Sequence, residues 1–184
     1  MEWMNLTAPD FVKAVKTSGG VCVLPLGSIE KHGDHLPVGI DTYAVQHRTR
    51  LACEKANVVM FPAVPFAENA EAMNNPGAVA MRREVLFDLV WNILDEIGRN
   101  GFRKIVIVSG HGGNVNFVGY LLQDSLYRDR DYLLYRCNVR PSAELQEKLL
   151  ESEEQAHAGE QETSMALTVV PNLRLAGGRR FAST

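Results

Sequence analysis

Hydrophobic residues along the chain follow two alternating patterns: short unbroken runs, and longer stretches with a repeat of three to four residues. The short runs are rich in valine, isoleucine and leucine, which is typical of strands buried on both faces. We predict a strand for each of these runs, at residues 21–26 (VCVLPL), 58–64 (VVMFPAV), 103–108 (RKIVIV) and 132–137 (YLLYRC).

The periodic stretches predict helices between these strands. The clearest covers residues 82–100, where apolar side chains recur at three- and four-residue steps and build one face, and Gly101 gives a stop. The first helix is expected to be capped by Thr7, with Pro9 in its first turn. Further helices are predicted at 42–55, from about Asn114, at 142–154 and at 162–169, the last ended by Pro171.

Alternation of strands and helices predicts an α/β fold with a mostly parallel sheet covered on both faces. We expect a single domain over residues 1–184, given about 150 residues per domain. Binding sites in such sheets lie beyond the carboxyl ends of the strands. The polar loops 27–41 and 109–114 each follow a predicted strand directly, so they should open onto the same edge of the sheet.

Composition narrows the class of protein. Hydrophobic residues make up 46% and charged residues 22%, with a net charge of −3 and no block of Lys and Arg, so we expect no nucleic-acid partner. No run of about 18 apolar residues is present, and the first residues lack signal-peptide features, so we expect no membrane association and a cytoplasmic location. The three scattered cysteines, Cys22, Cys53 and Cys137, are expected to be reduced and buried.

The loop GSIEKHGDHLPVGID (27–41) is unusually rich in potential metal ligands. Glu30, His32 and Asp41 are its candidates. On local sequence alone Asp41 is better explained as the N-cap of the helix that we expect to begin at Thr42, and the two roles can share its oxygens. His35 is expected to support the site by donating a hydrogen bond to a ligand carboxylate.

Two further segments carry candidate side chains. In SGHGGN (109–114) glycines flank His111, which suits a ligand held at a strand end; a plain turn and a phosphate cradle are the alternatives, although the P-loop lysine is missing. In HAGEQETS (157–164) His157 and Glu162 are candidates; alone they would be a surface histidine and a carboxylate at a helix N-terminus. His47 is expected at the surface. Imidazole and carboxylate ligands together suit zinc, manganese or iron.

Three segments, LPLGSIEKHGDHLPVGID, GFRKIVIVSGHGGN and HAGEQETS, occur in the order and spacing typical of the creatininase (creatinine amidohydrolase) family, which the chain resembles over nearly its whole length. The resemblance implies a three-layer α/β/α sandwich and hydrolysis of non-peptide or unusual C–N bonds with two divalent metal ions. Activities in the family include opening cyclic amides, removing formyl groups and trimming a modified peptide. Family members are commonly multimeric, so we expect a homo-oligomer, with a hexamer as one form.

The resemblance also implies roles for individual residues. Glu30, Asp41 and His111 would bind one metal ion, and His32 and Asp41 the second, with Asp41 bridging. Creatininase has a glutamate ligand of the second ion where this chain has Gly113, and we expect Glu162 or water to take its place. Gly112 stands where creatininase has a tyrosine that contacts the substrate, so creatinine is not the expected substrate. The chain ends soon after NLRLAGG, and we expect a domain truncated at its C-terminus relative to the family.

We therefore expect a metal-dependent amidohydrolase that cleaves a cyclic amide, formamide or other non-peptide C–N bond of a small-molecule substrate. His157 and Glu162 are the expected catalytic residues, His157 as the group that carries a proton to the leaving nitrogen. The ligand histidines must be neutral to bind, so metal is expected to be lost below about pH 6. Two alternatives remain open: a catalytically inactive module that binds metal or small anions, and a nucleotide-binding domain that uses SGHGGN.

Overall fold

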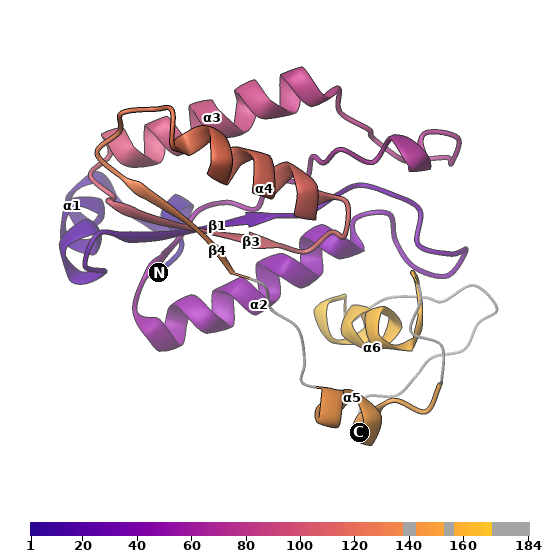
Figure 1. Ribbon diagram of the computed structural model, residues 1–184. Coiled ribbons are helices and arrows are strands. Elements are labelled where there is room, and N and C mark those ends of the chain that lie inside the picture. Colours follow the sequence, from indigo (N-terminus) through magenta and orange to yellow (C-terminus); the bar gives the residue numbers. More distant parts are fainter. Residues whose placement is uncertain (138–142, 153–156, 171–184) are drawn as a thin grey trace.

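A parallel sheet forms the centre of the molecule. The computed structural model describes residues 1–137, 143–152 and 157–170, and within them the sheet has the strand order β2-β1-β3-β4 (Figure 1). All its pairings are parallel. The strands are β1 (Val21–Leu26), β2 (Val59–Met60), β3 (Lys104–Ser109) and β4 (Leu133–Cys137).

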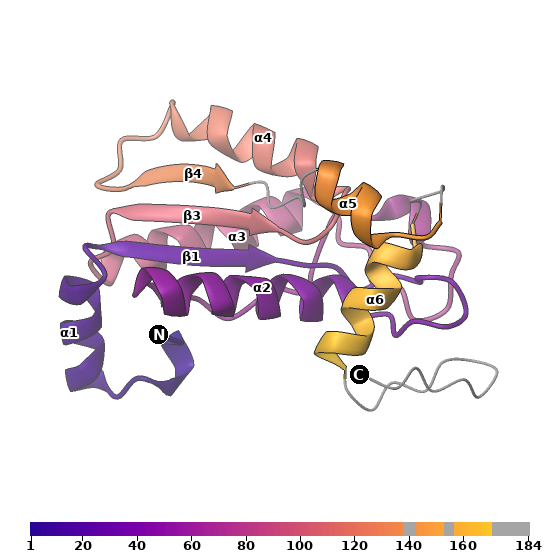
Figure 2. The same cartoon turned by 90° about the horizontal axis from the view of Figure 1, so that it is seen from below.

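Helices cover both faces of this sheet, α3 and α4 on one and α2 on the other (Figures 1 and 2), so the predicted three-layer α/β/α sandwich is confirmed. No helix among the described residues is long and apolar enough to span a membrane. The helices are α1 (Ala8–Thr17), α2 (Ile40–Ala56), α3 (Arg83–Arg99), α4 (Asn114–Ser125), α5 (Ala143–Leu149) and α6 (Glu160–Val169), with short 3-10 turns η1 (Trp3–Asn5) and η2 (Ala70–Ala72).

The central strands are buried on both faces, which explains their unbroken apolar runs. Leu24 belongs to the core cluster that α3 and α4 cover, whereas its neighbour Val23 packs with Val45 of α2 on the opposite face. The apolar stripe of α3 lies where the sequence places it, since Val90 and Leu94 are fully buried. Each central strand thereby packs against helices on both faces of the sheet.

Three expectations about the periphery need correction. The regular strand over 58–64 covers only Val59–Met60, and an isolated parallel bridge joins Val64 to Leu26 further along; Pro62 between them has no N–H for a sheet ladder. Cys137 is exposed rather than buried, because β4 is an edge strand whose side chains face mostly outward. The predicted helix over 142–154 covers only Ala143–Leu149. Pro171, residue 142, residues 153–154 and the NLRLAGG segment lie outside the described residues.

The start of α2 also differs from the prediction. The helix begins at Ile40 with Gly39 at its N-cap, so Asp41 lies inside the first turn and is not the cap. Its carboxylate instead accepts a hydrogen bond from the Ser28 hydroxyl, with Oγ and Oδ2 2.7 Å apart. Thr42 donates to the Ser28 carbonyl at 2.8 Å. The first turn of α2 is therefore hydrogen-bonded to the loop after β1 and has no side-chain N-cap.

Two glycines allow α2 to approach the ends of β1 and β3 this closely. A Cβ on Gly27 would lie 2.5 Å from the Thr42 Cα, and a Cβ on Gly110 would lie 2.7 Å from the Asp41 carbonyl oxygen. The Gly110 N–H also donates to the Leu26 carbonyl at 2.8 Å, which keeps the two strand ends side by side. The loops after β1 and β3 therefore share one edge, as predicted.

Replacing Gly110 by Ala should test this close approach. The added methyl group would meet the Val45 Cβ at 2.6 Å as well as the backbone of α2, so the helix must move. We expect a loss of about 1–3 kcal/mol in the free energy of unfolding, as for other overpacked sites, measured by urea denaturation. Gly112→Ala is the matched control, because its Cβ would meet nothing within 4 Å. Equal stability of the two variants would contradict the close-packing argument.

Candidate metal centre

Four segments that are distant in sequence enclose a cavity of about 670 Å³ at the carboxyl edge of the sheet. They are the loop after β1, the region around η2, the loop after β3, and the start of α6, which Figure 2 shows beyond the arrowheads of β1 and β3. All six predicted site residues line this cavity, namely Glu30, His32, Asp41, His111, His157 and Glu162. The sequence motifs therefore converge in space as expected.

Asp41 lies between two imidazole rings, one facing each of its oxygens. Its Oδ1 is 3.2 Å from the His32 Nε2, and its Oδ2 is 3.0 Å from the His111 Nδ1. All three side chains are buried. The hydroxyl of Ser28, which donates to Oδ2, fixes the rotation of the carboxylate. A single carboxylate thus faces two separate nitrogen donors, which is the arrangement expected of a bridging ligand.

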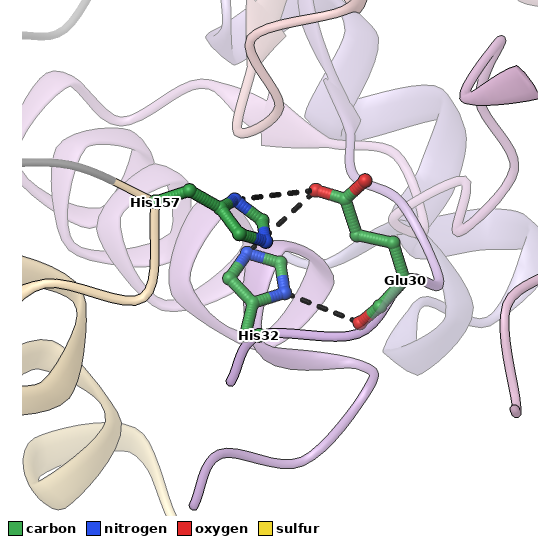
Figure 3. Close-up of side chains that lie close together, drawn as sticks. All are labelled: Glu30, His32 and His157. Atoms are coloured by element: carbon green, nitrogen blue, oxygen red, sulfur yellow. Dashed lines mark hydrogen bonds and ion pairs between the residues drawn. The ribbon is translucent and has the colours of Figure 1, made fainter. Parts of the chain in front are cut away.

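Glu30 lies beside the same two histidines. Its Oε1 is 3.1 Å from the His111 Nδ1 and 3.7 Å from the His32 Nε2. Only 4% of Glu30 is exposed, so this carboxylate is also withdrawn from water. Figure 3 shows Glu30 together with His32 and His157, whose rings lie against each other.

His157 and Glu162 close the cavity from the side of α6. The centre of the His157 ring is 4.2 Å from that of His32, and its Nδ1 is 3.9 Å from the Glu30 Oε1 (Figure 3). Its Nε2 lies 2.7 Å from the Lys31 carbonyl oxygen and therefore donates to it. Glu162 accepts a hydrogen bond from the Ala158 N–H, and its Oε2 is 3.9 Å from the His32 Nε2.

The two buried carboxylates, Glu30 and Asp41, favour a proton or another cation beside them. Burial opposes a charge on His111, but the adjacent Asp41 and Glu30 carboxylates outweigh it and raise the pKa of His111 to about 9. Burial likewise opposes the ionised form of Asp41, yet hydrogen bonds with His111, His32 and Ser28 hold its pKa well below the usual range. The pKa of His32 is raised in spite of burial, chiefly by Asp41.

The residues present fit a bound divalent metal ion. The Nε2 atom of His111 is buried and has no hydrogen-bond partner, which is uncommon for a buried polar atom. Ligands at right angles around an ion with bonds of about 2.1 Å lie about 3 Å apart, close to the 3.0 and 3.2 Å that separate Asp41 from the two histidines. The groups whose ligand atoms lie within 4.8 Å of one another are Glu30/His32/His157, His32/Asp41/Glu162 and Glu30/Glu71/His111.

Phosphate binding is disfavoured by the same geometry. Carboxylates from Glu30, Asp41, Glu71 and Glu162 all line the cavity and would repel an anion. In addition, Asn114 at the start of α4 donates its side-chain amide to the Gly27 carbonyl at 3.1 Å. The glycine-rich loop after β3 therefore serves to bring His111 to the carboxylates, and the nucleotide-binding alternative loses its support.

Two histidines lie differently from their predicted positions. His35 does not reach a ligand carboxylate; its Nε2 is 3.0 Å from the Thr163 hydroxyl and links the loop after β1 to α6. His47 is half-buried on α2 rather than at the surface. Sequence reasoning also missed Ser28 and Glu71. Glu71 follows the strand at β2 as the other candidates follow β1 and β3, and that placement could have indicated it.

Comparison with known proteins agrees with this arrangement. The chain is 31% identical over 159 residues to the mycofactocin precursor peptide peptidase of Mycolicibacterium smegmatis, covering 82% of this chain and 58% of that protein. The chain thus spans somewhat more than half the length of this relative. It also resembles the structure of a putative creatinine amidohydrolase from Bacteroides fragilis, with 30% identity and a TM-score of 0.75, covering 94% of this chain and 69% of that one.

A third similar structure, named as a manganese form of creatininase, has a TM-score of 0.75 at 23% identity and covers 94% of this chain and 74% of its own. At that identity the likeness concerns the fold. The family described as creatinine amidohydrolase matches residues 4–175, which include every segment around the cavity. Fold, converging motifs and sequence similarity thus agree, and the chain belongs to the creatininase family.

Proposed function

We propose that the chain is a metal-dependent amidohydrolase that holds two divalent ions and cleaves a carbon–nitrogen amide bond. The observation that carries this proposal is that the two oxygens of Asp41 face different histidines. One ion would be held by Glu30, Asp41 and His111, and the other by His32, Asp41 and Glu162. Zinc, manganese and iron suit this donor set, since the described residues that line the cavity include no cysteine.

The chain's own side chains supply the remaining chemistry. When bound, the ions would lower the pKa of a water molecule and polarise the amide carbonyl. His157 donates its Nε2–H to the Lys31 carbonyl, so in the neutral ring Nδ1 carries the lone pair and faces Glu30. That atom can take a proton and return it to the leaving nitrogen, which departs readily only when protonated. Glu162 would hold the second ion and keep the start of α6, with His157, against it.

The family and the sequence relatives support two substrate classes. Cyclic amides and formamides are the first, as the family description, creatinine amidohydrolase, suggests. An amide bond in a modified peptide is the second, favoured by the 31% identity to a precursor peptide peptidase. The absence of a side chain at Gly112, whose Cβ would meet nothing within 4 Å, leaves room beside His111 for a substrate larger than creatinine.

The alternative of an inactive metal-binding module makes a different prediction for activity. Both proposals require metal uptake, but only the hydrolase requires turnover. A panel of formamides, cyclic amides, creatinine and short peptides, assayed with the metal-loaded protein, separates the two. Turnover of any of these compounds that is abolished by a chelator and restored by added metal supports the hydrolase.

Removal of Asp41 should empty both metal positions. Because this carboxylate faces both histidines, we expect Asp41→Ala to lose both ions and Glu30→Ala to lose mainly one, as measured by elemental analysis after gel filtration. Asp88→Ala, at an exposed position on α3, is the control and should keep full metal content. If both site variants retain as much metal as the control, the assignment of ligands is wrong.

Metal binding should release a proton at neutral pH. Because the pKa of His111 is raised to about 9, its ring is protonated in the ion-free protein and must lose that proton to act as a ligand. Affinity should therefore rise with pH until about pH 9, changing about tenfold per unit below it. Calorimetric titration in buffers of different ionisation enthalpy should report about one proton released per ion at this position.

The stability of the ion-free fold should change with pH in the opposite direction to the metal affinity. A raised pKa in the folded state means that protonation of His111 stabilises the ion-free fold, and that this contribution is lost as the pH rises through about 9. Metal affinity that does not change with pH, together with no proton release, would contradict the proposed role of His111.

His157 should affect turnover without affecting metal content. We expect His157→Gln to lower kcat by about 10²–10⁴-fold on any substrate that the wild-type protein cleaves, because proton transfer to the leaving nitrogen is lost. Metal content should stay at the wild-type level, since the ligands assigned above are intact. His47→Gln on α2, outside the cavity, is the control. A variant with unchanged kcat would exclude His157 from the proton transfer.

A further inference from the structure

His35 connects the loop after β1 to helix α6, although it does not itself line the cavity. Its Nε2 lies 3.0 Å from the Thr163 hydroxyl, and both side chains are half-buried. Thr163 directly follows Glu162, the carboxylate that α6 contributes to the cavity. The contact therefore joins the neighbour of one candidate ligand, Glu162, to the loop that carries another, His32.

The turn that carries His35 is closed on itself, which fixes His35 relative to His32. The Leu36 N–H donates to the His32 carbonyl at 3.3 Å, and these two residues form an isolated bridge. Gly33 lies inside the turn in the left-handed region, with a φ of 59°, and a Cβ there would lie 2.7 Å from the His35 Nδ1. The imidazole of His35 therefore packs directly over the Gly33 backbone, which leaves its Nε2 facing Thr163.

The turn before α6 shares this small space. A Cβ on Gly33 would also lie 3.5 Å from the Ala158 Cβ. Ala158 has a φ of 60°, which is uncommon for a residue other than glycine, and its N–H donates to the Glu162 carboxylate. His157 directly precedes Ala158 in the chain. A displacement of α6 at the His35 contact would therefore move Glu162 and His157 together.

A small apolar cluster also holds α6 against the loop after β1 and against α2. Its buried members are Leu36, Ile40 and Ala166. Apolar contacts have no directional preference, so they allow the helix to turn about its own axis. A hydrogen bond weakens steeply away from its preferred angle. The bond to Thr163 therefore fixes the rotation of α6, and that rotation decides where the adjacent Glu162 points.

We propose that His35 is a positioning residue that acts through Thr163 to hold Glu162 and His157 at the second metal position; this proposal rests on the proposed function above. The second metal position is the one that Glu162 completes. The first metal position takes its ligands only from α2 and from the loops after β1 and β3, so it should not depend on α6. Loss of the His35 contact should therefore weaken the binding of one ion and spare the other.

The first test is a titration of ion-free protein with Zn²⁺ in competition with a chromophoric chelator. We expect wild-type protein to bind two ions, and His35→Ala and Thr163→Val to bind one of them about tenfold more weakly, because ligand orientation is lost. Thr163→Ser keeps the hydroxyl and should bind both ions as wild type does. Thr168→Val is the matched control, because this exposed threonine of α6 bonds only within its helix, to the Ser164 carbonyl at 3.3 Å.

The second test needs no metal ion and follows hydrogen exchange of the ion-free protein. Removing one hydrogen bond should raise the exchange rates of the α6 amides about 2- to 10-fold in His35→Ala. Amides of β1 and β3 should keep their wild-type rates. The double variant His35→Ala/Thr163→Val should change α6 no more than either single variant, because both substitutions remove the same bond.

The outcomes separate this proposal from the one on which it rests. If wild-type protein binds no ion, the proposed function fails and the role of His35 at the second metal position fails with it. If wild-type protein binds two ions and His35→Ala binds both with unchanged affinity, only the role of His35 is overturned. Equal weakening of both ions, or weakened binding in Thr163→Ser, would point to a general loss of structure and would also overturn it. Unchanged exchange in β1 and β3 excludes misfolding of the variants as the cause of a selective loss.

Discussion

The approach of α2 to the ends of β1 and β3 is the constraint on which the rest of the structure depends. Only hydrogen atoms at Gly27 and Gly110 separate the first turn of the helix from these strand ends. The approach places Asp41 between His32, from the loop after β1, and His111, from the loop after β3. A helix one methyl group further away would leave the two histidines without their shared carboxylate. Backbone packing in the sandwich thus determines the spacing of the candidate ligands.

The same arrangement explains the electrostatic state of the ion-free site. Burying Glu30 and Asp41 together is unfavourable unless positive charge accompanies them. A proton on His111 provides that charge, which is why its pKa is raised to about 9. In the proposed function, a divalent metal ion would replace this proton and add a second positive charge in the same place. On that proposal, folding and metal binding would be linked through one imidazole.

The sequence predicted the parts of the site that depend on local rules, and missed those that depend on tertiary contacts. Motif loops directly after predicted strands could be assigned to one sheet edge, because parallel strands share a direction. The role of Asp41 could not be separated from helix capping, because its partner Ser28 becomes visible only once α2 packs on the loop. Glu71 lay in a polar loop without periodicity, and it reaches the cavity through tertiary contacts such as the hydrogen bond from Asn69 to the Ile29 carbonyl. Cys137 was expected to be buried because nothing in YLLYRC indicates an edge strand.

The candidate site has one part held by the sheet and α2 and a second part attached through α6, and these two parts can vary independently. Glu30, His32, Asp41 and His111 belong to segments bound directly to the sheet or to α2, so their relative positions follow from the core. Glu162 belongs to α6, and His157 to the turn that precedes it. Helix α6 is attached to the loop after β1 by the hydrogen bond between His35 and Thr163 and by a small apolar cluster of Leu36, Ile40 and Ala166. Contacts of this size open at lower free energy than a sheet does. Changes in α6 or η2 can therefore alter the cavity without disturbing Asp41 and its two histidines, which is consistent with one family containing both a creatinine amidohydrolase and a peptide peptidase.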